Sequence, residues 1–178
     1  MIAGADRQRL LVLARQALSA RVRGAPAPSA PDDLFILAFG VFVTIYHRSE
    51  LRGCLGTLNA SEPLAQAVVR LAGDVSHNDH RFEPIEVHEI DDTIINLSVL
   101  TAPEPVDDPT IIVVGRDGLI VEHGSRRGLL LPQVAPEHGW DREAFLAHTC
   151  LKAGLAADAW RNDAIIFRFE AEVFGEGR

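Results

Sequence analysis

The sequence predicts an α+β fold in which a mostly antiparallel sheet is flanked by helices. Segments of strand composition dominate the middle of the chain, helical periodicity lies on both sides of them, and strands and helices do not alternate regularly. The length of 178 residues and the hydrophobic content of 47% suit one globular domain, residues 1–178, that can carry two lobes.

The first half of the chain predicts two helices and a hairpin between them. Residues 6–21 place leucine and alanine at helical spacing, which indicates an amphipathic helix. Residues 39–46 and 51–56 are apolar runs separated by a short polar turn, so we expect them to pair as a hairpin. Residues 62–75 return to helical spacing, with Ser61 as the expected N-cap.

The second half predicts a strand, a second hairpin, a helix and a last strand. Residues 93–100 have strand composition, and residues 118–123 and 129–131 flank a GSRRG turn. Residues 141–153 form the expected helix, capped by the aspartate at its start. Residues 165–173 alternate apolar and charged side chains, which predicts a half-buried antiparallel strand whose odd-numbered residues are apolar.

Composition and charge argue against several classes of function. The net charge of −8 lacks the basic excess of a nucleic-acid-binding domain, so such a role ranks behind the hypotheses below. The longest apolar run, Leu34–Tyr46, is shorter than the roughly 20 residues of a membrane helix, so we expect no membrane partner. With two cysteines and no secretory h-region at the N-terminus, the chain is expected in the cytoplasm with reduced thiols.

The stretch LRGCLGT, Leu51–Thr57, is the strongest candidate for chemistry. Side chains alternate between the faces of a strand, so Arg52 and Cys54 should share one face, with their Cα atoms about 7 Å apart. Leu51 and Leu55 would then face the core. The motif would present a cation and a thiol together.

Two interpretations of Cys54 stay open. A guanidinium favours the thiolate, which would make Cys54 a nucleophile or a redox thiol. Cysteine is also among the most buried residues and often serves as a small hydrophobic side chain, which is how we interpret Cys150. The absence of side chains at Gly53 and Gly56 lets a ligand or another chain segment approach the backbone closely.

Other polar residues give weaker signals. The chain has seven histidines, and none has a spacing to Cys54 that identifies it as a base. His77 and His80 are too few for a metal site, so no metal site is predicted. Asp79 and Arg81 form either a charge-paired loop that closes the fold or part of a ligand site.

The motifs LRGCLGT, DHRF, NLSVL, LLLPQVA and CLKAGL together resemble the AMMECR-one domain family, whose prokaryotic members are called AmmeMemoRadiSam system protein A. The resemblance runs in order from Phe42 to Trp160. It implies a two-lobed α+β fold with the LRGCLGT signature near a cleft between the lobes. It also implies two partners, a Memo-like protein and a radical-SAM enzyme. It supplies no reaction, and the cofactor is left unknown.

The sequence departs from the family pattern at three positions. Asn96 stands where glutamate is usual, Asp117 where histidine is common, and His80 where proline is usual. If the usual glutamate at position 96 or the common histidine at position 117 were an obligatory acid or base in the family, this protein would lack it. These departures weaken a Cys–His dyad and favour the pair of Cys54 and Arg52.

Two functional hypotheses follow. In the first, the protein is an enzyme or enzyme subunit in which Arg52 binds or polarises a small polar or anionic substrate and Cys54 is the nucleophile or redox thiol. In the second, it is a non-catalytic module that docks the Memo-like protein or the radical-SAM enzyme through LRGCLGT. The remaining candidates for substrate contact are Gly53, Gly56, Thr57, Asp79, Arg81 and Gln133.

Overall fold

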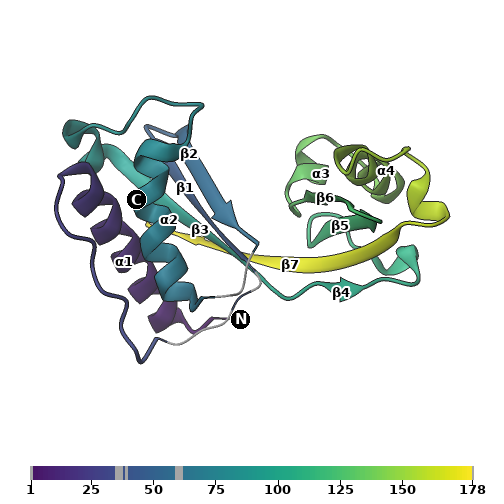
Figure 1. Cartoon of the computed structure of the whole chain (residues 1–178), viewed down its shortest axis with the longest axis horizontal. Helices are drawn as coiled ribbons and strands as arrows, with labels where there is room; N and C mark the ends of the chain where they lie inside the picture. Colours follow the sequence, from purple (N-terminus) through teal and green to yellow (C-terminus); the bar gives the residue numbers. More distant parts are fainter. Residues whose placement is uncertain (1, 35–37, 39, 59–61, 178) are drawn as a thin grey trace. The chain divides into compact units, whose positions relative to one another are not determined.

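The computed structural model describes residues 2–34, 38, 40–58 and 62–177 (Figure 1). The chain divides into two compact units. Unit 1 comprises Met1–Leu100 and Glu172–Arg178, and unit 2 comprises Thr101–Ala171. The strand pairings are antiparallel and helices accompany them in each unit, which confirms the α+β class.

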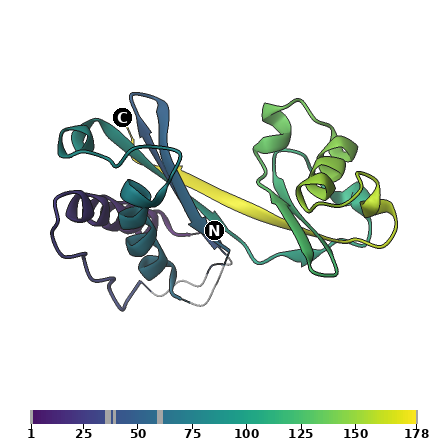
Figure 2. The same ribbon diagram turned by 45° about the horizontal axis from the view of Figure 1, so that its top comes forward.

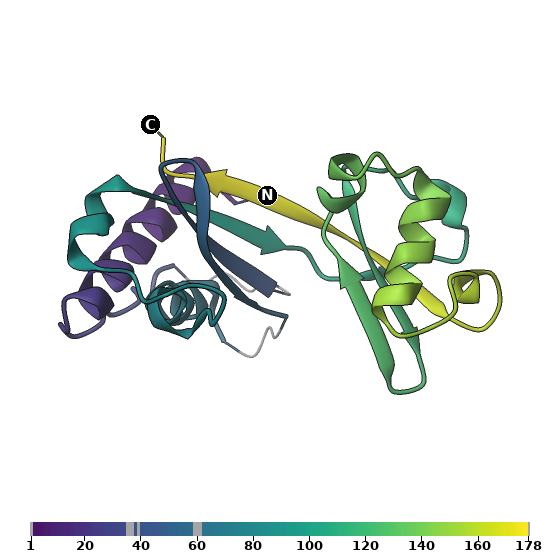
Figure 3. The ribbon, with the colours of Figure 1, turned by 90° about the horizontal axis from the view of Figure 1, so that it is seen from above.

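Unit 1 places two helices on one face of an antiparallel sheet (Figures 1 and 3). The strand order is β2-β1-β3, and the C-terminal end of β7 lies beside β3. Its elements are α1 (Gly4–Val22), β1 (Gly40–His47), β2 (Glu50–Thr57), α2 (Leu64–Asn78), the 3-10 helix η1 (Val87–Asp92), β3 (Thr93–Leu100) and the end of β7 (Ile165–Gly175).

The core of unit 1 follows from strand alternation. Val43 and Ile45 on β1 are fully buried, as are their β3 partners Leu97 and Ile95, and all four pack in one cluster with α1 and α2. Side chains at alternate positions of a strand point to opposite faces, so Thr44 must lie on the face away from the helices.

In unit 2, short helices pack against a second set of antiparallel strands, which lie in the order β6-β5-β7-β4. Figure 2 shows α4 lying over β5 and β6, and these elements are in contact. Its elements are β4 (Glu104–Pro105), η2 (Pro109–Ile111), β5 (Asp117–His123), β6 (Arg126–Leu130), α3 (Val134–Glu137), α4 (Arg142–Lys152), η3 (Ala159–Arg161) and the start of β7.

The structure confirms most of the elements expected from the sequence. The predicted strand at 93–100 coincides with β3, and the Asp141 side chain caps α4 by accepting a hydrogen bond from the Ala144 N–H at 2.8 Å. The predicted N-cap Ser61 lies outside the described residues. Sequence reasoning did not anticipate η1, η2, η3, α3 or β4, because such short elements carry too few residues to show a period.

The prediction for the last strand is wrong in its burial pattern. Ile165 and Val173, both predicted on the apolar side, are 58% and 57% exposed, whereas the even-numbered Ile166 is buried; Phe169 is buried as predicted. Ile166 and Phe169 lie three positions apart and both belong to unit 2, so a period of two does not hold even within that unit.

None of the helices in the described part of the chain has the length and apolar composition that a membrane span requires.

Candidate functional site

A β-bulge interrupts strand β2 within the LRGCLGT stretch. Ile45 on β1 pairs with Gly53, but the next residue, Tyr46, pairs with Leu51, so Arg52 is an extra residue in β2. The bulge breaks the simple alternation that predicted a shared face for Arg52 and Cys54. Leu51 is 40% exposed, which corrects the expectation that it faces the core.

The Arg52 side chain makes four hydrogen bonds within unit 1. Its guanidinium donates two hydrogen bonds to the Glu89 carboxylate, at 2.8 and 2.9 Å. It donates two more to the backbone carbonyls of Glu83 and Pro84, at 2.7 and 3.1 Å. The hydrogen bonds that Arg52 donates to the Glu89 carboxylate lower the pKa of Glu89 to about 2. Arg52 therefore holds the segment before η1 against β2, and the predicted pairing of Arg52 with the Cys54 thiol is not observed.

Cys54 instead lies beside a hydroxyl group on the neighbouring strand. Its Sγ is 3.3 Å from Thr44 Oγ1, and Thr44 pairs in turn with Asn96 on β3. The three side chains cross three strands on the sheet face away from α1 and α2, and each is half-buried. We call Cys54, Thr44 and Asn96 the polar row.

The polar row ends against β7. A Cβ at Gly175 would lie 1.9 Å from Asn96 Oδ1, so the carboxamide of Asn96 occupies the space where a side chain at 175 would begin. Glycine at this position allows Asn96 to stay in the row.

The peptide of Cys54 is held on the outer edge of the sheet by Asp79 and Arg81. Because β2 is an edge strand, the outward N–H of Cys54 has no strand partner, and Asp79 Oδ2 accepts it at 2.8 Å. Arg81 donates to both carboxylate oxygens of Asp79, at 2.9 and 2.7 Å, and to the Cys54 carbonyl at 3.4 Å.

The Asp79 carboxylate is almost fully buried, at 6% exposed. Hydrogen bonds from Arg81 hold its pKa well below the usual range, although burial works in the opposite direction. Asp79 therefore stays charged. The contacts of Asp79 and Arg81 match the charge-paired loop, which was the first of the two interpretations.

The glycines of the signature allow close approach inside the fold. A Cβ at Gly53 would lie 3.0 Å from Val75 Cγ2, so glycine lets α2 pack onto β2. A Cβ at Gly56 would lie 2.2 Å from the ring of Phe42, so glycine lets this ring lie against the strand. The neighbours that approach these two glycines are therefore a helix and an aromatic ring of unit 1.

The last two sequence candidates lie in different units. Thr57 pairs with Val41 at the end of β2, in unit 1. Gln133 precedes α3 and is exposed, in unit 2. The structure thus brings together Cys54, Asp79 and Arg81, while Arg52 contacts Glu89.

Sequence reasoning missed Thr44 as a site residue, and it noticed Asn96 only as a departure from a family pattern. The signal that could have found Thr44 is the register of the hairpin, which places Thr44 opposite Cys54. The turn that sets this register contains Arg48 and Ser49, both with positive φ, and neither is a usual residue for such a turn.

In the described part of the chain, neither a histidine partner nor a metal cluster accompanies the thiol. None of the hydrogen bonds or ion pairs among the described residues joins a histidine to Cys54. The same residues contain no group of three histidine, cysteine or acidic side chains suited to hold a metal ion.

Fold and site together define a class of protein. It is an α+β protein with a half-buried thiol on the sheet face away from α1 and α2, and an edge carboxylate and a guanidinium hold the backbone at that thiol.

The sequence matches the AMMECR1 family model over residues 11–174, so the chain belongs to the AMMECR1 family, as the LRGCLGT resemblance indicated. A protein of Methanothermobacter thermautotrophicus is 45% identical over 182 residues, which cover 96% of this chain and 95% of that protein. A protein of Thermofilum pendens is 45% identical over 187 residues, covering 94% and 88%.

A solved structure shares the fold. The crystal structure of the uncharacterized protein PH0010 from Pyrococcus horikoshii has a TM-score of 0.85 and 40% sequence identity, with 98% of this chain and 93% of that chain covered. The names of these relatives state no activity.

Proposed function

We propose that this protein is an enzyme or enzyme subunit that acts through the polar row, with the Cys54 thiol as the reactive group toward a small polar substrate. The observation that carries the proposal is the 3.3 Å contact between Cys54 Sγ and Thr44 Oγ1, on a strand whose backbone is held at that residue. A hydroxyl that donates to sulfur favours the thiolate, which is the nucleophilic form. Asn96 adds an amide donor and acceptor for a substrate.

Arg81 takes the cationic role that the sequence gave to Arg52. Its side chain is 58% exposed. Its pKa is raised mainly by hydrogen bonds to Asp79 and in smaller part by the charge of Cys54. A thiolate at Cys54 is therefore attracted to this guanidinium. In the proposed site, Arg52 and Asp79 position the strand, and Thr44, Asn96 and Arg81 face the substrate.

The test is the alkylation rate of Cys54 by iodoacetamide against pH, read by mass spectrometry. Cys150 is the internal comparison, because it is fully buried and burial raises the pKa of its thiol. We expect Cys54 to react much faster than Cys150 in the folded protein. Thr44→Val removes the hydroxyl at nearly constant shape and should slow Cys54 about fivefold at neutral pH. If Cys54 is as slow as Cys150 until the protein unfolds, the proposal is wrong.

A second candidate function is the non-catalytic module that docks the Memo-like protein or the radical-SAM enzyme of the same system. It is favoured by the packing of the signature, since Arg52, Gly53 and Gly56 all have partners inside unit 1. Cys54→Ser should then leave partner binding intact, while Thr44→Arg, on the sheet face away from α1 and α2, should abolish it in a pull-down. If the protein is an enzyme, Cys54→Ser should instead abolish activity.

We also infer a cytoplasmic location, because both cysteines of the chain are free thiols. The two units are proposed to form one domain of two subdomains, because β7 contributes residues to both.

A further inference from the structure

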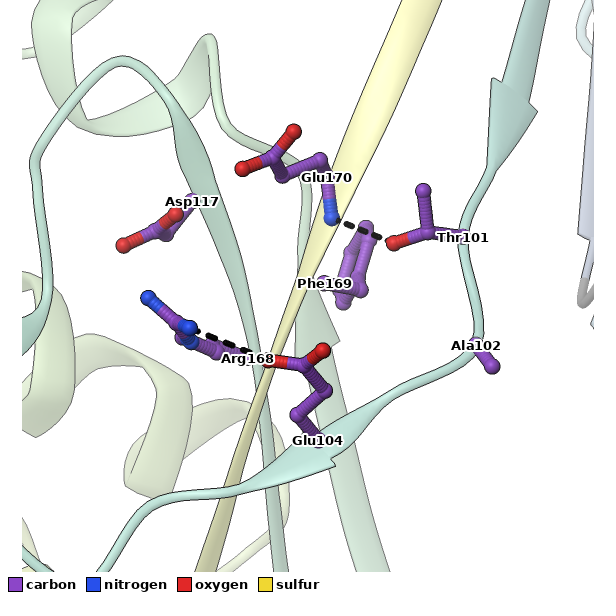
Figure 4. Close-up of a pocket in the computed structure, with 7 residues that line it drawn as sticks. All are labelled: Thr101, Ala102, Glu104, Asp117, Arg168, Phe169 and Glu170. Atoms are coloured by element: carbon purple, nitrogen blue, oxygen red, sulfur yellow. Dashed lines mark hydrogen bonds and ion pairs between the residues drawn. The ribbon is translucent and has the colours of Figure 1, made fainter. Parts of the chain in front are cut away.

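Unit 2 contains a polar cavity of about 440 Å³ that has no part in the proposed site (Figure 4). Its volume falls within the range of small-molecule pockets, roughly 300–1,000 Å³. Every residue that lines it belongs to unit 2, and the polar row belongs to unit 1. Four of the lining side chains carry charge: Glu104, Asp117, Arg168 and Glu170.

The cation of the cavity is Arg168 on β7. Its Nη2 donates to Glu104 Oε2 at 3.0 Å, drawn as a dashed line in Figure 4. The Glu104 side chain is 67% exposed, whereas Arg168 is 29% exposed. Exposed ion pairs contribute little to stability, so another carboxylate can replace Glu104 at little cost.

A fixed negative charge lies beside this cation. Asp117 is fully buried, and its carboxylate accepts hydrogen bonds from Arg116 at 2.7 and 2.8 Å and from the Val113 N–H at 2.8 Å. Burial opposes the charged form, but these hydrogen bonds outweigh it, and the pKa of Asp117 lies below its ordinary value. Asp117 therefore keeps its charge at neutral pH.

Glu170 supplies a second carboxylate from the neighbouring strand. It pairs in register with Asp117, and its backbone is anchored because the Glu170 N–H donates to Thr101 Oγ1 at 2.9 Å and its carbonyl accepts the Thr101 N–H at 2.9 Å. Its carboxylate is 61% exposed and reaches Arg116 only at 3.7 Å. The backbone is held while the charged end stays accessible.

The cavity therefore presents both signs of charge on fixed elements. Glu104 and Glu170 would repel a simple anion and Arg168 would repel a simple cation, while the charge of Asp117 is paired with Arg116. We propose that this cavity binds a small zwitterion of the amino-acid type. The ligand carboxylate pairs with Arg168 in place of Glu104, and the ligand ammonium lies at the accessible carboxylate of Glu170.

The test is a ¹⁵N NMR titration of the full-length protein with each standard L-amino acid singly, followed at the amides of Thr101, Gly118 and Glu170. Acetate and methylammonium, the two halves of glycine, are titrated in parallel. At least one amino acid should shift these amides saturably, with a Kd of about 1 mM or tighter. Both halves should bind at least about tenfold more weakly.

Three variants and two matched controls sharpen the test. Arg168→Gln and Glu170→Gln should each weaken binding about tenfold. Glu104→Gln should tighten binding about threefold, because it removes the competitor for Arg168. The controls Arg126→Gln and Glu143→Gln lie outside the cavity lining and should not change binding. Because Glu170 is largely exposed, its variant keeps the test valid if Arg168→Gln does not fold.

Several results would overturn the proposal. Acetate that binds as well as the amino acids would make this a carboxylate site, and methylammonium that does so would make it a cation site. If no amino acid shifts these amides saturably, the cavity does not bind amino-acid zwitterions and the proposal is wrong. The outcome is independent of Cys54, so it can fail while the proposed function stands.

Discussion

Arg52 shows how one contact set decides the role of a residue. Its guanidinium makes four hydrogen bonds within unit 1, two of them to the carboxylate of Glu89. The Glu89 side chain is only 12% exposed, so the pair is well shielded from solvent. Arg52 thus contributes to stability, and the contribution depends on the charge of Glu89.

Replacing Glu89 by glutamine should lower the free energy of unfolding at pH 7 by about 1–3 kcal/mol. The pKa of Glu89 is about 2 in the folded protein and ordinarily 4.5, so its contribution is complete above pH 4.5 and is lost as the pH falls toward 2. Urea titrations at neutral and acidic pH measure this, and the gap between parent and Glu89→Gln should close in acid.

The matched control is Glu143→Gln, which removes an exposed ion pair with Arg161. It should cost less than about 1 kcal/mol at either pH. A gap for Glu89→Gln that is the same at both pH values would show that its charge is not what stabilises the protein.

At the scale of elements, glycine positions determine which helices can pack on which strands. A Cβ at Gly128 on β6 would lie 2.4 Å from the backbone N of Ala153 and 2.7 Å from the carbonyl of Thr149, at the end of α4. These neighbours are backbone atoms, so they cannot move aside as a side chain would. The close packing of α4 on β6 therefore requires glycine at 128.

Gly128→Ala should destabilise the protein by about 1–3 kcal/mol. Gly73→Ala is the matched substitution within α2, where a Cβ would meet only ordinary contacts, the nearest at 3.7 Å from Arg21 Cβ. It should stabilise the protein by about 0.5–1 kcal/mol, since alanine favours a helix over glycine. Thermal denaturation followed by circular dichroism gives both values, and equal effects would contradict the packing argument.

At the scale of the whole molecule, the C-terminal segment fastens unit 1. Glu176 accepts hydrogen bonds from Arg15 on α1 and from the Ile95 N–H on β3 at 2.9 Å. Glu172 accepts the Ile2 N–H at 2.9 Å. Residues from the far end of the sequence therefore join α1 to the sheet.

Deleting residues 172–178 should destabilise unit 1 by several hydrogen bonds, about 3 kcal/mol or more in total. Both tryptophans, Trp140 and Trp160, belong to unit 2, so their fluorescence reports that unit alone. Comparing fluorescence with far-ultraviolet circular dichroism tests the single-domain proposal. One domain predicts coincident transitions in the parent protein, whereas two separate transitions would show that the units unfold independently.

Local sequence patterns predicted the helices and strands but did not predict the arrangement of the site. β3 and the β1–β2 hairpin were predictable from strand composition and a polar turn, and α4 from the aspartate that caps it. The bulge at Arg52 was not predictable, because an extra residue in one strand shows only against its partner strand. Because of this bulge, Arg52 pairs with Glu89 and does not accompany Cys54.

The sequence by itself determined the α+β class, the order of the long elements and membership of the AMMECR1 family, since these follow from local patterns and motifs. Only the tertiary structure decided that Thr44 and Asn96 accompany Cys54, that Glu89 takes Arg52, and that charges of both signs line a cavity in unit 2. Pairing register, edge position and ion-pair choice join residues far apart in the chain, and no local pattern encodes them.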